Sequence, residues 1–334
     1  MSATPELGTP WRIGPVEVPN RVLLAPLAGI GNWFVRLQAK RYGAGLAVSE
    51  MVSSFAIHHR NEKTMRELLR IHPDERAGGP VSIQLFGHDP EVMRSAAATV
   101  AEHGADLIDL NMGCPVPKVC KTGAGAALIK DPDTAVAVAI AAREGSGLPV
   151  TVKLRAGRKR GETEGVDVAR RLVDEAGVAG ISFHPRSAAV QHKGEPDLDL
   201  AAELVRTLPA PVILSGGMRD PAWIADAFER TGATAVMLAR GALGDPWLFA
   251  RLLDAGTAEP SHDEVLDELE WVLARAAEHL GEERAARYLR KFYPWYVDRL
   301  RADRTLNDAL QRTASLAEAR EVLGTLRRPV AAAA

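Results

Sequence analysis

Short apolar segments alternate regularly with segments of helical pattern along the first 255 residues of the chain. Eight apolar segments are predicted to be buried strands, at residues 21–25, 46–49, 81–85, 107–110, 150–154, 180–184, 212–214 and 235–239. The predicted helices follow them, at residues 33–41, 62–69, 90–103, 133–144, 165–176, 198–207, 222–230 and 247–255. This alternation predicts a parallel sheet, because parallel strands need a crossover connection, which is usually a helix.

Eight strand–helix units favour an α/β fold, the (β/α)8 TIM barrel, which takes about 250 residues. A doubly wound sheet is the alternative. The case for its dinucleotide-binding version is weak, because no G-x-G-x-x-G run follows the first strand. Residues 11–18 are expected to form a short strand or hairpin before the barrel. Past residues 256–260 the composition changes to Ala, Glu, Arg and Leu at helical spacing. We therefore expect a barrel over residues 1–257 and an all-helical domain over residues 258–334, frayed at Ala331 to Ala334.

The charge balance argues against one broad class of protein. With 41 basic and 43 acidic residues the formal net charge is −2, so the chain is not a globally basic nucleic-acid binder, although a local basic patch remains open. The N-terminus lacks the pattern of a signal peptide, and no run reaches about 20 apolar residues. We expect a cytoplasmic monomer with no membrane partner.

The two cysteines, Cys114 and Cys120, are too few and too close for a disulfide framework. No Cys or His pair at zinc spacing accompanies them, so we expect no metal and a reducing compartment. Cys114 stands in the run Asn111-Met112-Gly113-Cys114-Pro115, where the fourth strand gives way to a loop because Pro115 cannot continue the ladder. Barrels carry their active sites at this end of their strands. The thiol could there be a nucleophile, a proton donor or a packing group.

Polar or glycine-rich residues follow the other predicted strands as well. In strand order they are Ala25-Pro26-Leu27, Glu50, Gln84, Lys153, His184-Pro185-Arg186, Ser215-Gly216-Gly217 and Ala239-Arg240. Each has a structural alternative: Gln84 could satisfy a loop carbonyl, Lys153 could pair with Glu50, and His184 could be a core histidine. Their common position at one rim of a barrel favours a ligand site. Glycines after the seventh and eighth strands suit a phosphate, because backbone N–H groups can approach an anion there.

Several of these segments resemble the tRNA-dihydrouridine synthase family of flavin enzymes. The similar runs are APLAGIGNWFVR from residue 25, QLFG from 84, NMGCPVPKVCKTGAGAALI from 111, HPRSAAVQHKG from 184 and ARGALGDPWLF from 239. The resemblance covers most of residues 20–255, and Arg290-Lys291-Phe292 to Tyr296 is similar to the family's C-terminal helical domain. The N-x-G-C-P-x-x-K-V run is the most specific of them.

The resemblance implies an FMN lying across the barrel mouth. Ala25, Pro26 and Leu27 would contact the isoalloxazine, while Gln84 and Lys153 would bond its pyrimidine edge. The remaining residues implied on the cofactor are Asn111, His184 near the ring, and Ser215, Gly216, Gly217, Ala239 and Arg240 at the phosphate. The chain departs from the family at three places: Ser215-Gly216-Gly217 replaces Asn-Gly-Asp, Pro185 replaces Gly, and Gly31 replaces Thr.

The resemblance also implies the reaction. NADPH reduces the flavin, a hydride passes to carbon-6 of a flipped-out uracil, and Cys114 protonates carbon-5. An ordinary thiol, with a pKa of about 8.5, stays mostly protonated at neutral pH and suits this role. Cys120 corresponds to a variable position and is expected to be structural or incidental.

The expected substrate is tRNA, and the basic residues Arg186, Arg284, Arg287, Arg290 and Lys291 are expected on the RNA-binding surface. Arg284, Arg287 and Lys291 have helical spacing on one face, whereas Arg158-Lys159-Arg160 follows the fifth strand. A merely solvated helix face would also be basic. Two other functions remain open: an FMN barrel dehydrogenase that acts on a free pyrimidine, and a non-catalytic RNA-binding relic. Tyr288, Phe292 and Trp295 are expected to be a core stripe rather than base-stacking groups.

Overall fold

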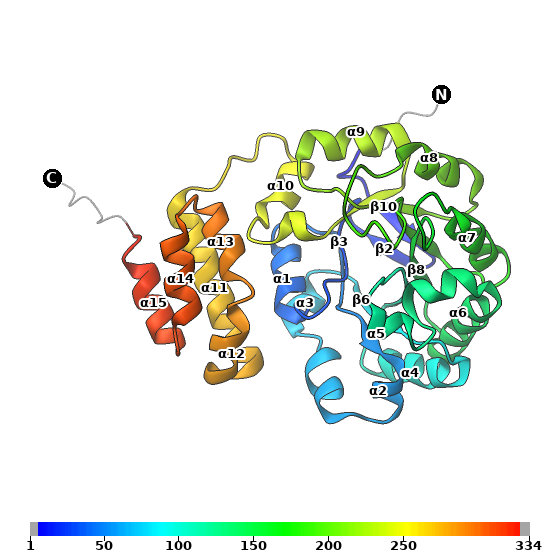
Figure 1. Ribbon diagram of the computed structural model, residues 1–334, viewed down its shortest axis with the longest axis horizontal. Coiled ribbons are helices and arrows are strands. Elements are labelled where there is room, and N and C mark those ends of the chain that lie inside the picture. Colours follow the sequence, from blue (N-terminus) through cyan, green and yellow to red (C-terminus); the bar gives the residue numbers. More distant parts are fainter. Residues whose placement is uncertain (1–5, 328–334) are drawn as a thin grey trace.

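The computed structural model describes residues 6–327 and contains a closed barrel of eight parallel strands (Figure 1). Around the barrel the strands are β4 (Leu46–Val48), β3 (Val22–Leu24), β11 (Ala235–Leu238), β10 (Val212–Ser215), β9 (Gly180–His184), β8 (Val150–Arg155), β7 (Leu107–Met112) and β6 (Val81–Phe86). The pairing of β4 with β6 closes the barrel, and a short β5 (Val52–Ser53) extends the sheet beside β6. The predicted fold class is confirmed.

Helices surround the barrel; those between two strands return the chain to the start of the next strand, and the last one leads to the C-terminal helices (Figure 1). They are α1 (Trp33–Arg41), α4 (Pro90–Glu102), α6 (Pro132–Ser146), α7 (Glu164–Asp174), α8 (Leu198–Thr207), α9 (Pro221–Thr231) and α10 (Trp247–Leu253). Three of them begin at Asp-Pro pairs, in which the Asp caps the backbone N–H groups and the Pro fixes the first helical φ.

The connection between β4 and β6 differs from the single helix predicted at residues 62–69. It contains α2 (Ser54–His58), a π-helical turn at Thr64–Leu68 and α3 (Pro73–Ala77). Pro73 has no backbone N–H to donate and holds the preceding residue in an extended conformation, so a helix cannot run through it. Short helical turns that the sequence pattern did not indicate occur at α5 (Pro117–Cys120), η2 (Gly125–Lys130) and η3 (Arg240–Ala242).

A hairpin of β1 (Trp11–Ile13) and β2 (Val16–Val18) lies against the amino ends of the barrel strands. Its buried side chains Trp11, Ile13 and Val18 form one apolar cluster with residues at the start of several strands, including Leu107 and Ala235. One end of the barrel is therefore filled, which leaves the carboxyl ends of the strands as the open end.

The C-terminal helices pack beside α1 and α10 (Figure 1). They are α11 (His262–Leu280), α12 (Glu282–Leu289), α13 (Tyr293–Arg299), α14 (Arg304–Arg312) and α15 (Leu316–Gly324). Ser261 caps α11 in a reciprocal pair with Glu264, so the helical part begins where the composition changes. Their buried side chains belong to the same apolar cluster as those of the barrel helices. The expected fraying at Ala331 to Ala334 lies outside the described residues.

Tyr288, Phe292 and Trp295 pack against this shared core, and the Tyr288 and Phe292 rings lie 6.4 and 6.1 Å from the ring of Phe34. No helix among residues 6–327 combines the length and apolarity that a membrane crossing requires.

A buried carboxylate anchors α11 to α1. Glu268 is only 4% exposed and accepts hydrogen bonds from Gln38 (2.8 Å), Tyr42 (2.7 Å) and Arg41 (3.2 Å). Three donors from one barrel helix and the residue that follows it thus converge on one side chain of the helical domain. Removing the carboxylate would leave these donors without an acceptor in a desolvated interface.

We expect Glu268→Ala to lower the free energy of unfolding by about 3 kcal/mol, measured as a fall in the thermal midpoint. Asp267→Ala is the matched control, because the neighbouring Asp267 forms an exposed ion pair with Arg327 in which both side chains are about half accessible or more, at 67% and 46%. Such pairs contribute about 0.2–1 kcal/mol. Equal losses in the two variants would contradict the anchoring role of Glu268.

Candidate active site

A cavity of about 770 Å³ opens at the carboxyl ends of the barrel strands. Its size is in the range of cofactor sites in proteins. Thirteen of the residues singled out from the sequence line it: Ala25, Pro26, Gln84, Asn111, Cys114, Lys153, His184, Arg186, Ser215, Gly216, Gly217, Ala239 and Arg240. The barrel topology thus brings together side chains from most of its strands, as their common position in the strand–helix units indicated.

Leu27 is the residue expected on the cofactor that does not line the cavity. Its side chain is buried in the core, and its carbonyl accepts hydrogen bonds from Ile30 (3.1 Å) and Gly31 (2.7 Å). A Cβ at Gly31 would lie 2.8 Å from the Glu50 nitrogen and 2.9 Å from the Leu27 oxygen. The glycine that replaces the family's Thr is therefore required by this tight turn.

A chain of hydrogen bonds runs from the barrel interior to the Cys114 loop. Asp109 accepts from Thr151 Oγ1 and from Gln84 Nε2, both at 2.6 Å. Gln84 Oε1 accepts from Asn111 Nδ2 (2.9 Å), and Asn111 Oδ1 accepts from the Cys114 N–H (2.9 Å). Since a carboxylate can only accept, Asp109 fixes which way both amide side chains point.

Asp109 was not singled out from the sequence, although it lies two residues before Asn111 on β7 and so faces the same side of the strand. Its side chain is 1% exposed. Burial raises its pKa to about 6, against the opposing effects of the hydrogen bonds from Thr151 and Gln84. At neutral pH the Asp109 carboxyl is still mostly ionised, which allows it to accept hydrogen bonds from both Thr151 and Gln84.

Cys114 lies half-buried on the loop after β7. Burial raises the pKa of its thiol above the ordinary value, while a hydrogen bond from the Val116 backbone opposes the rise. The thiol is therefore protonated at neutral pH. Its carbonyl accepts from the Ala126 N–H (3.0 Å) and from Cys120 Sγ (3.3 Å). Cys120 thus adds a second hydrogen bond to the backbone of the Cys114 loop.

Lys153 lies on β8 near the floor of the cavity and donates to Ser215 Oγ (3.1 Å). Burial and the neighbouring charge of Arg155 lower its pKa to about 8, although Asp109 acts in the opposite direction. The alternative pairing with Glu50 is absent, because Glu50 accepts from the Gly29 N–H (2.8 Å) instead. Lys153 is available to an anionic or acceptor group in the cavity.

Arg155 and His192 are further cavity residues that the sequence reasoning missed. Arg155 is 5% exposed and joins the Cys114 loop to the loop after β9, because it donates to the carbonyls of Gly113 (3.1 Å), Ser187 (3.2 Å) and Gln191 (2.7 Å). Its position at the end of β8, two residues after Lys153, was the available signal. The His192 ring lies 6.0 Å from that of His184 in a stacked arrangement.

His184 is a neutral ring beside cations. Burial first, and then the charges of Lys153 and Arg155, hold its pKa far below the ordinary value. Its Nε2 accepts from Arg186 (3.3 Å), which also donates to the Gly194 carbonyl (2.6 Å). Arg186, expected on the RNA surface, is 8% exposed and fastens the loop after β9.

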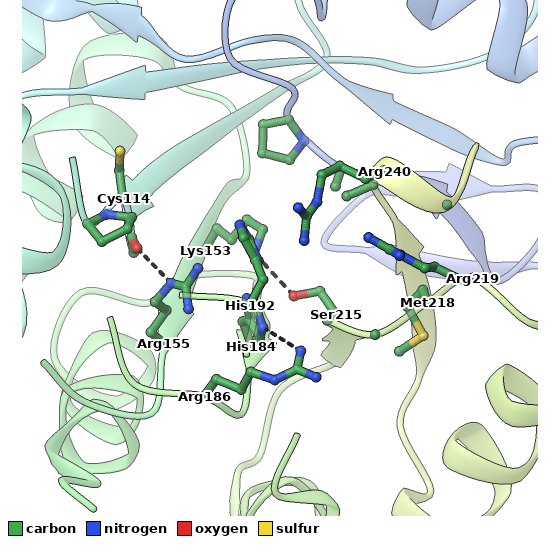
Figure 2. Close-up of a pocket in the computed structure, with 18 of the residues that line it drawn as sticks. Cys114, Lys153, Arg155, His184, Arg186, His192, Ser215, Met218, Arg219 and Arg240 are labelled. Carbon is green, nitrogen blue, oxygen red and sulfur yellow. Dashed lines mark hydrogen bonds between the residues drawn. The ribbon is translucent and has the colours of Figure 1, made fainter. Parts of the chain in front are cut away.

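The opposite side of the cavity forms a cationic cradle after β10 and β11. Gly216 and Gly217 have φ angles of +102° and +86°, and a Cβ on Gly216 would lie 2.4 Å from the His184 ring. Figure 2 shows Arg219 and Arg240 beside each other on this side, with Cys114 across the cavity. Burial lowers the pKa of Arg240, and the like charge of Arg219 adds to the effect. Two neighbouring cations beside open backbone are suited to an anion.

The other residues expected on the RNA surface lie outside this cavity. Arg284 donates twice to Glu67 (2.9 and 2.8 Å) and so helps to lower the pKa of that carboxyl to about 2. Arg290 donates to the Thr313 carbonyl (3.1 Å), and Arg287 to Glu283 (2.8 Å).

Lys291 donates to the Gly29 carbonyl (3.1 Å) in the turn after β3. Because α12 ends at Leu289, Lys291 lies beyond the helix on which the spacing had placed it with Arg284 and Arg287.

Comparison with known proteins identifies relatives that match most of the chain. Residues 23–331 match the family model described as dihydrouridine synthase (Dus). The chain is 36% identical over 293 residues to tRNA-dihydrouridine synthase B of Pseudomonas aeruginosa, covering 86% of each chain. It is 38% identical over 318 residues to the probable tRNA-dihydrouridine synthase of Mycobacterium tuberculosis strain H37Rv, covering 90% of this chain and 80% of that protein.

Solved structures that are similar share the fold at low identity. Morphinone reductase in complex with tetrahydroNAD is 18% identical, with a TM-score of 0.56 over 78% of this chain and 94% of that chain. 2-Naphthoyl-CoA reductase in complex with 2-naphthoyl-CoA is 14% identical, with a TM-score of 0.61 over 78% of this chain and 53% of that chain.

The hydrogen-bond chain makes a prediction about Asp109. In Asp109→Asn the new side chain has an NH₂ group that can face the NH₂ group of Gln84, or its oxygen can do so only in one of two orientations. The orientation of Gln84 is then no longer fixed, and the Asn111 oxygen is no longer held toward the Cys114 N–H. We expect hydrogen exchange of the Cys114 amide to become about tenfold faster, the equivalent of one hydrogen bond of about 1.4 kcal/mol. Mass spectrometry of the loop peptide measures it.

Thr151→Val is the control, because it removes the other donor to Asp109 but keeps the path through Gln84 and Asn111. Unchanged exchange in Asp109→Asn, or equal acceleration in both variants, would show that Asp109 does not orient the loop.

Proposed function

The chain belongs to the dihydrouridine synthase family, and we propose that it reduces specific uridines of tRNA to 5,6-dihydrouridine with FMN as cofactor and NADPH as reductant. The observation that carries this proposal is the arrangement in one cavity of a protonated thiol, a lysine and a cationic glycine cradle. A flat ring carrying a phosphate fits between them. The reduction of a pyrimidine double bond needs a proton donor on the substrate side, which Cys114 supplies.

The residues present fit FMN in three respects. The Gly216 and Gly217 backbone with Arg240 and Arg219 would hold its phosphate, because these four residues line the cavity and offer backbone N–H groups and two positive charges to an anion. Lys153 would contact the polar pyrimidine edge, and Ala25 and Pro26 offer a wall of small side chains. When bound, FMN would supply the two-electron reducing chemistry, renewed by NADPH.

The chain's own contribution to the reaction centres on the Cys114 loop. Asn111 and Arg155 hold the loop so that the thiol faces the cavity, and burial keeps the thiol protonated. Cys114 Sγ would donate its proton to carbon-5 of the uracil and be reprotonated from solvent. Lys153 would place a positive charge near the electron-rich reduced cofactor.

The tRNA would approach over the rim between the barrel mouth and the helical domain. Arg287 and Lys291 are the cations of the predicted set that could meet RNA phosphates there, because both are exposed and each has one partner at the surface, Glu283 or the Gly29 carbonyl. Arg284 is bound twice to the buried Glu67, and Arg290 is itself half-buried. Phosphate contacts position a nucleic acid without reading its sequence.

We expect Cys114→Ala to bind FMN and to be reduced by NADPH like the parent protein, while dihydrouridine formation falls by about 10²–10⁴-fold. The reason is that only the proton donor is removed. In the parent protein the rate should fall on the alkaline side only above the ordinary pKa of a thiol, since a general acid must be protonated and burial raises the pKa of Cys114. Mass spectrometry of tRNA nucleosides measures the product.

Cys120→Ala is the control and should lose little activity, because the Cys114 carbonyl to which its Sγ donates keeps a second donor, the Ala126 N–H. Near-parental dihydrouridine formation by Cys114→Ala would reject the assigned role. Efficient reduction of free uracil by the parent protein would favour the free-pyrimidine alternative.

We expect Lys153→Met to bind FMN about 10–100-fold more weakly, because a hydrogen bond to a charged group contributes about 1.5–3 kcal/mol. Fluorescence titration of the apoprotein with FMN measures the affinity. Lys118→Met is matched, since this exposed lysine of the Cys114 loop does not line the cavity and should leave FMN binding unchanged. Parental affinity in Lys153→Met would remove Lys153 from the cofactor site.

A further inference from the structure

A second cavity, of about 570 Å³, borders the Cys114 loop. Pro115 lines both this cavity and the mouth cavity, so the loop separates the two. The other walls come from the loop after β8, with Arg158 and Lys159, and from the loop after β9, with Ala188 and Gln191. The proposed reaction assigns no role to this space or to the Arg158-Lys159 segment.

Four basic side chains and no acidic one line the second cavity: Lys121, Lys130, Arg158 and Lys159. Lys130 forms ion pairs with Glu162 and Glu164. Within residues 6–327, the side chains of Lys121, Arg158 and Lys159 make no hydrogen bond or ion pair, and all three are exposed. Three positive charges without an ion-pair partner thus surround one hollow, which attracts an anion.

The backbone that carries two of these cations is fixed. The carbonyls of Gly157 and Arg158 accept from the N–H groups of Ala188 (2.8 Å) and Ala189 (2.9 Å). The Lys159 N–H donates to Glu162 Oε2 (2.8 Å), so this carboxylate is used by the loop itself. A Cβ at Gly157 would lie 2.4 Å from the Glu162 carbonyl, which shows how closely the turn is packed. A preformed loop lowers the entropy cost of binding.

We propose that the second cavity binds a phosphate group of the RNA strand next to the base that enters the mouth cavity. A nucleotide whose base reaches Cys114 must pass its backbone close to Pro115, and Pro115 is the wall that both cavities share. The Arg158 guanidinium can bond two phosphate oxygens at once, while the lysines act as point charges. This inference rests on the proposed function. The 2′-phosphate of NADPH has the same chemistry and is the other possible source of the bound group.

The test is a triple variant, Lys121→Gln, Arg158→Gln and Lys159→Gln, which keeps the backbone bonds of the loops. Fluorescence anisotropy with labelled tRNA should show an affinity about tenfold or more below that of the parent protein. The slope of log K against log salt should fall in magnitude by about 0.7–0.9, because the contact with one phosphate is lost. FMN content should stay parental, because the three side chains do not line the mouth cavity.

The matched control is Arg143→Gln, Arg206→Gln and Arg230→Gln. These residues lie in the last turns of α6, α8 and α9, at the opposite end of the barrel, and removing them takes away the same charge. The control should bind tRNA nearly as the parent protein does. If both triple variants lose tRNA affinity equally, the effect is one of net charge and the site is rejected.

Reduction of the flavin by NADPH and by NADH distinguishes the two sources. A higher KM for NADPH but not for NADH, with parental tRNA affinity, would assign the phosphate to the dinucleotide and reject the RNA strand. Parental behaviour with both tRNA and NADPH would overturn the site altogether. If the parent protein binds tRNA but forms no dihydrouridine, the proposed function fails, while the anisotropy result still decides the phosphate site.

Discussion

The buried carboxylate of Asp109 is the constraint on which the position of the Cys114 loop depends. It lies inside the barrel, where a charge is tolerated only if its donors satisfy it, and it receives hydrogen bonds from Thr151 and Gln84. Gln84 and Asn111 could each be rotated by 180° without loss of shape, so neither amide alone determines its orientation. The carboxylate determines both, and through Asn111 it determines where the Cys114 backbone lies.

Positive charge dominates the rest of the cavity. Lys153, Arg155, Arg186 and Arg240 line it. The two histidines beside them are held neutral, because burial lowers the pKa of each ring and the neighbouring positive charges lower it further. Within the described residues, Arg155 and Arg186 are bonded to loop carbonyls, whereas Lys153 donates only to a hydroxyl. Structural and ligand-binding cations can therefore be told apart by what they already contact. An anionic cofactor would be attracted by all of these cations, but it would be bound directly by those, such as Lys153, that no loop carbonyl already occupies.

The sequence was sufficient for the barrel because its evidence is local. Each strand is a short apolar run, and the residues that follow it must meet at one rim once the sheet closes. Asp109 was not predicted as a site residue because it lies within the apolar run 107–110, where one polar residue gives no sign of facing a cavity. Arg284 was assigned to RNA because its partner Glu67 is 217 positions away in the sequence, and no periodicity in α12 could reveal that pair. Sequence patterns cannot predict contacts between residues that lie far apart in the chain.

The helical domain is connected to the active site through the turn after β3. Lys291 donates to the Gly29 carbonyl, Glu50 accepts from the Gly29 N–H, and the Tyr288 hydroxyl accepts from the amide nitrogen of Asn32, the cap of α1. The same turn begins at Ala25 and Pro26, which line the cavity. Because α1 is also held to α11 through Glu268, the helical domain and the cavity wall share one rigid helix. A substrate that touches both surfaces therefore meets them in a fixed relative position, which is what selecting one uridine within a folded RNA requires.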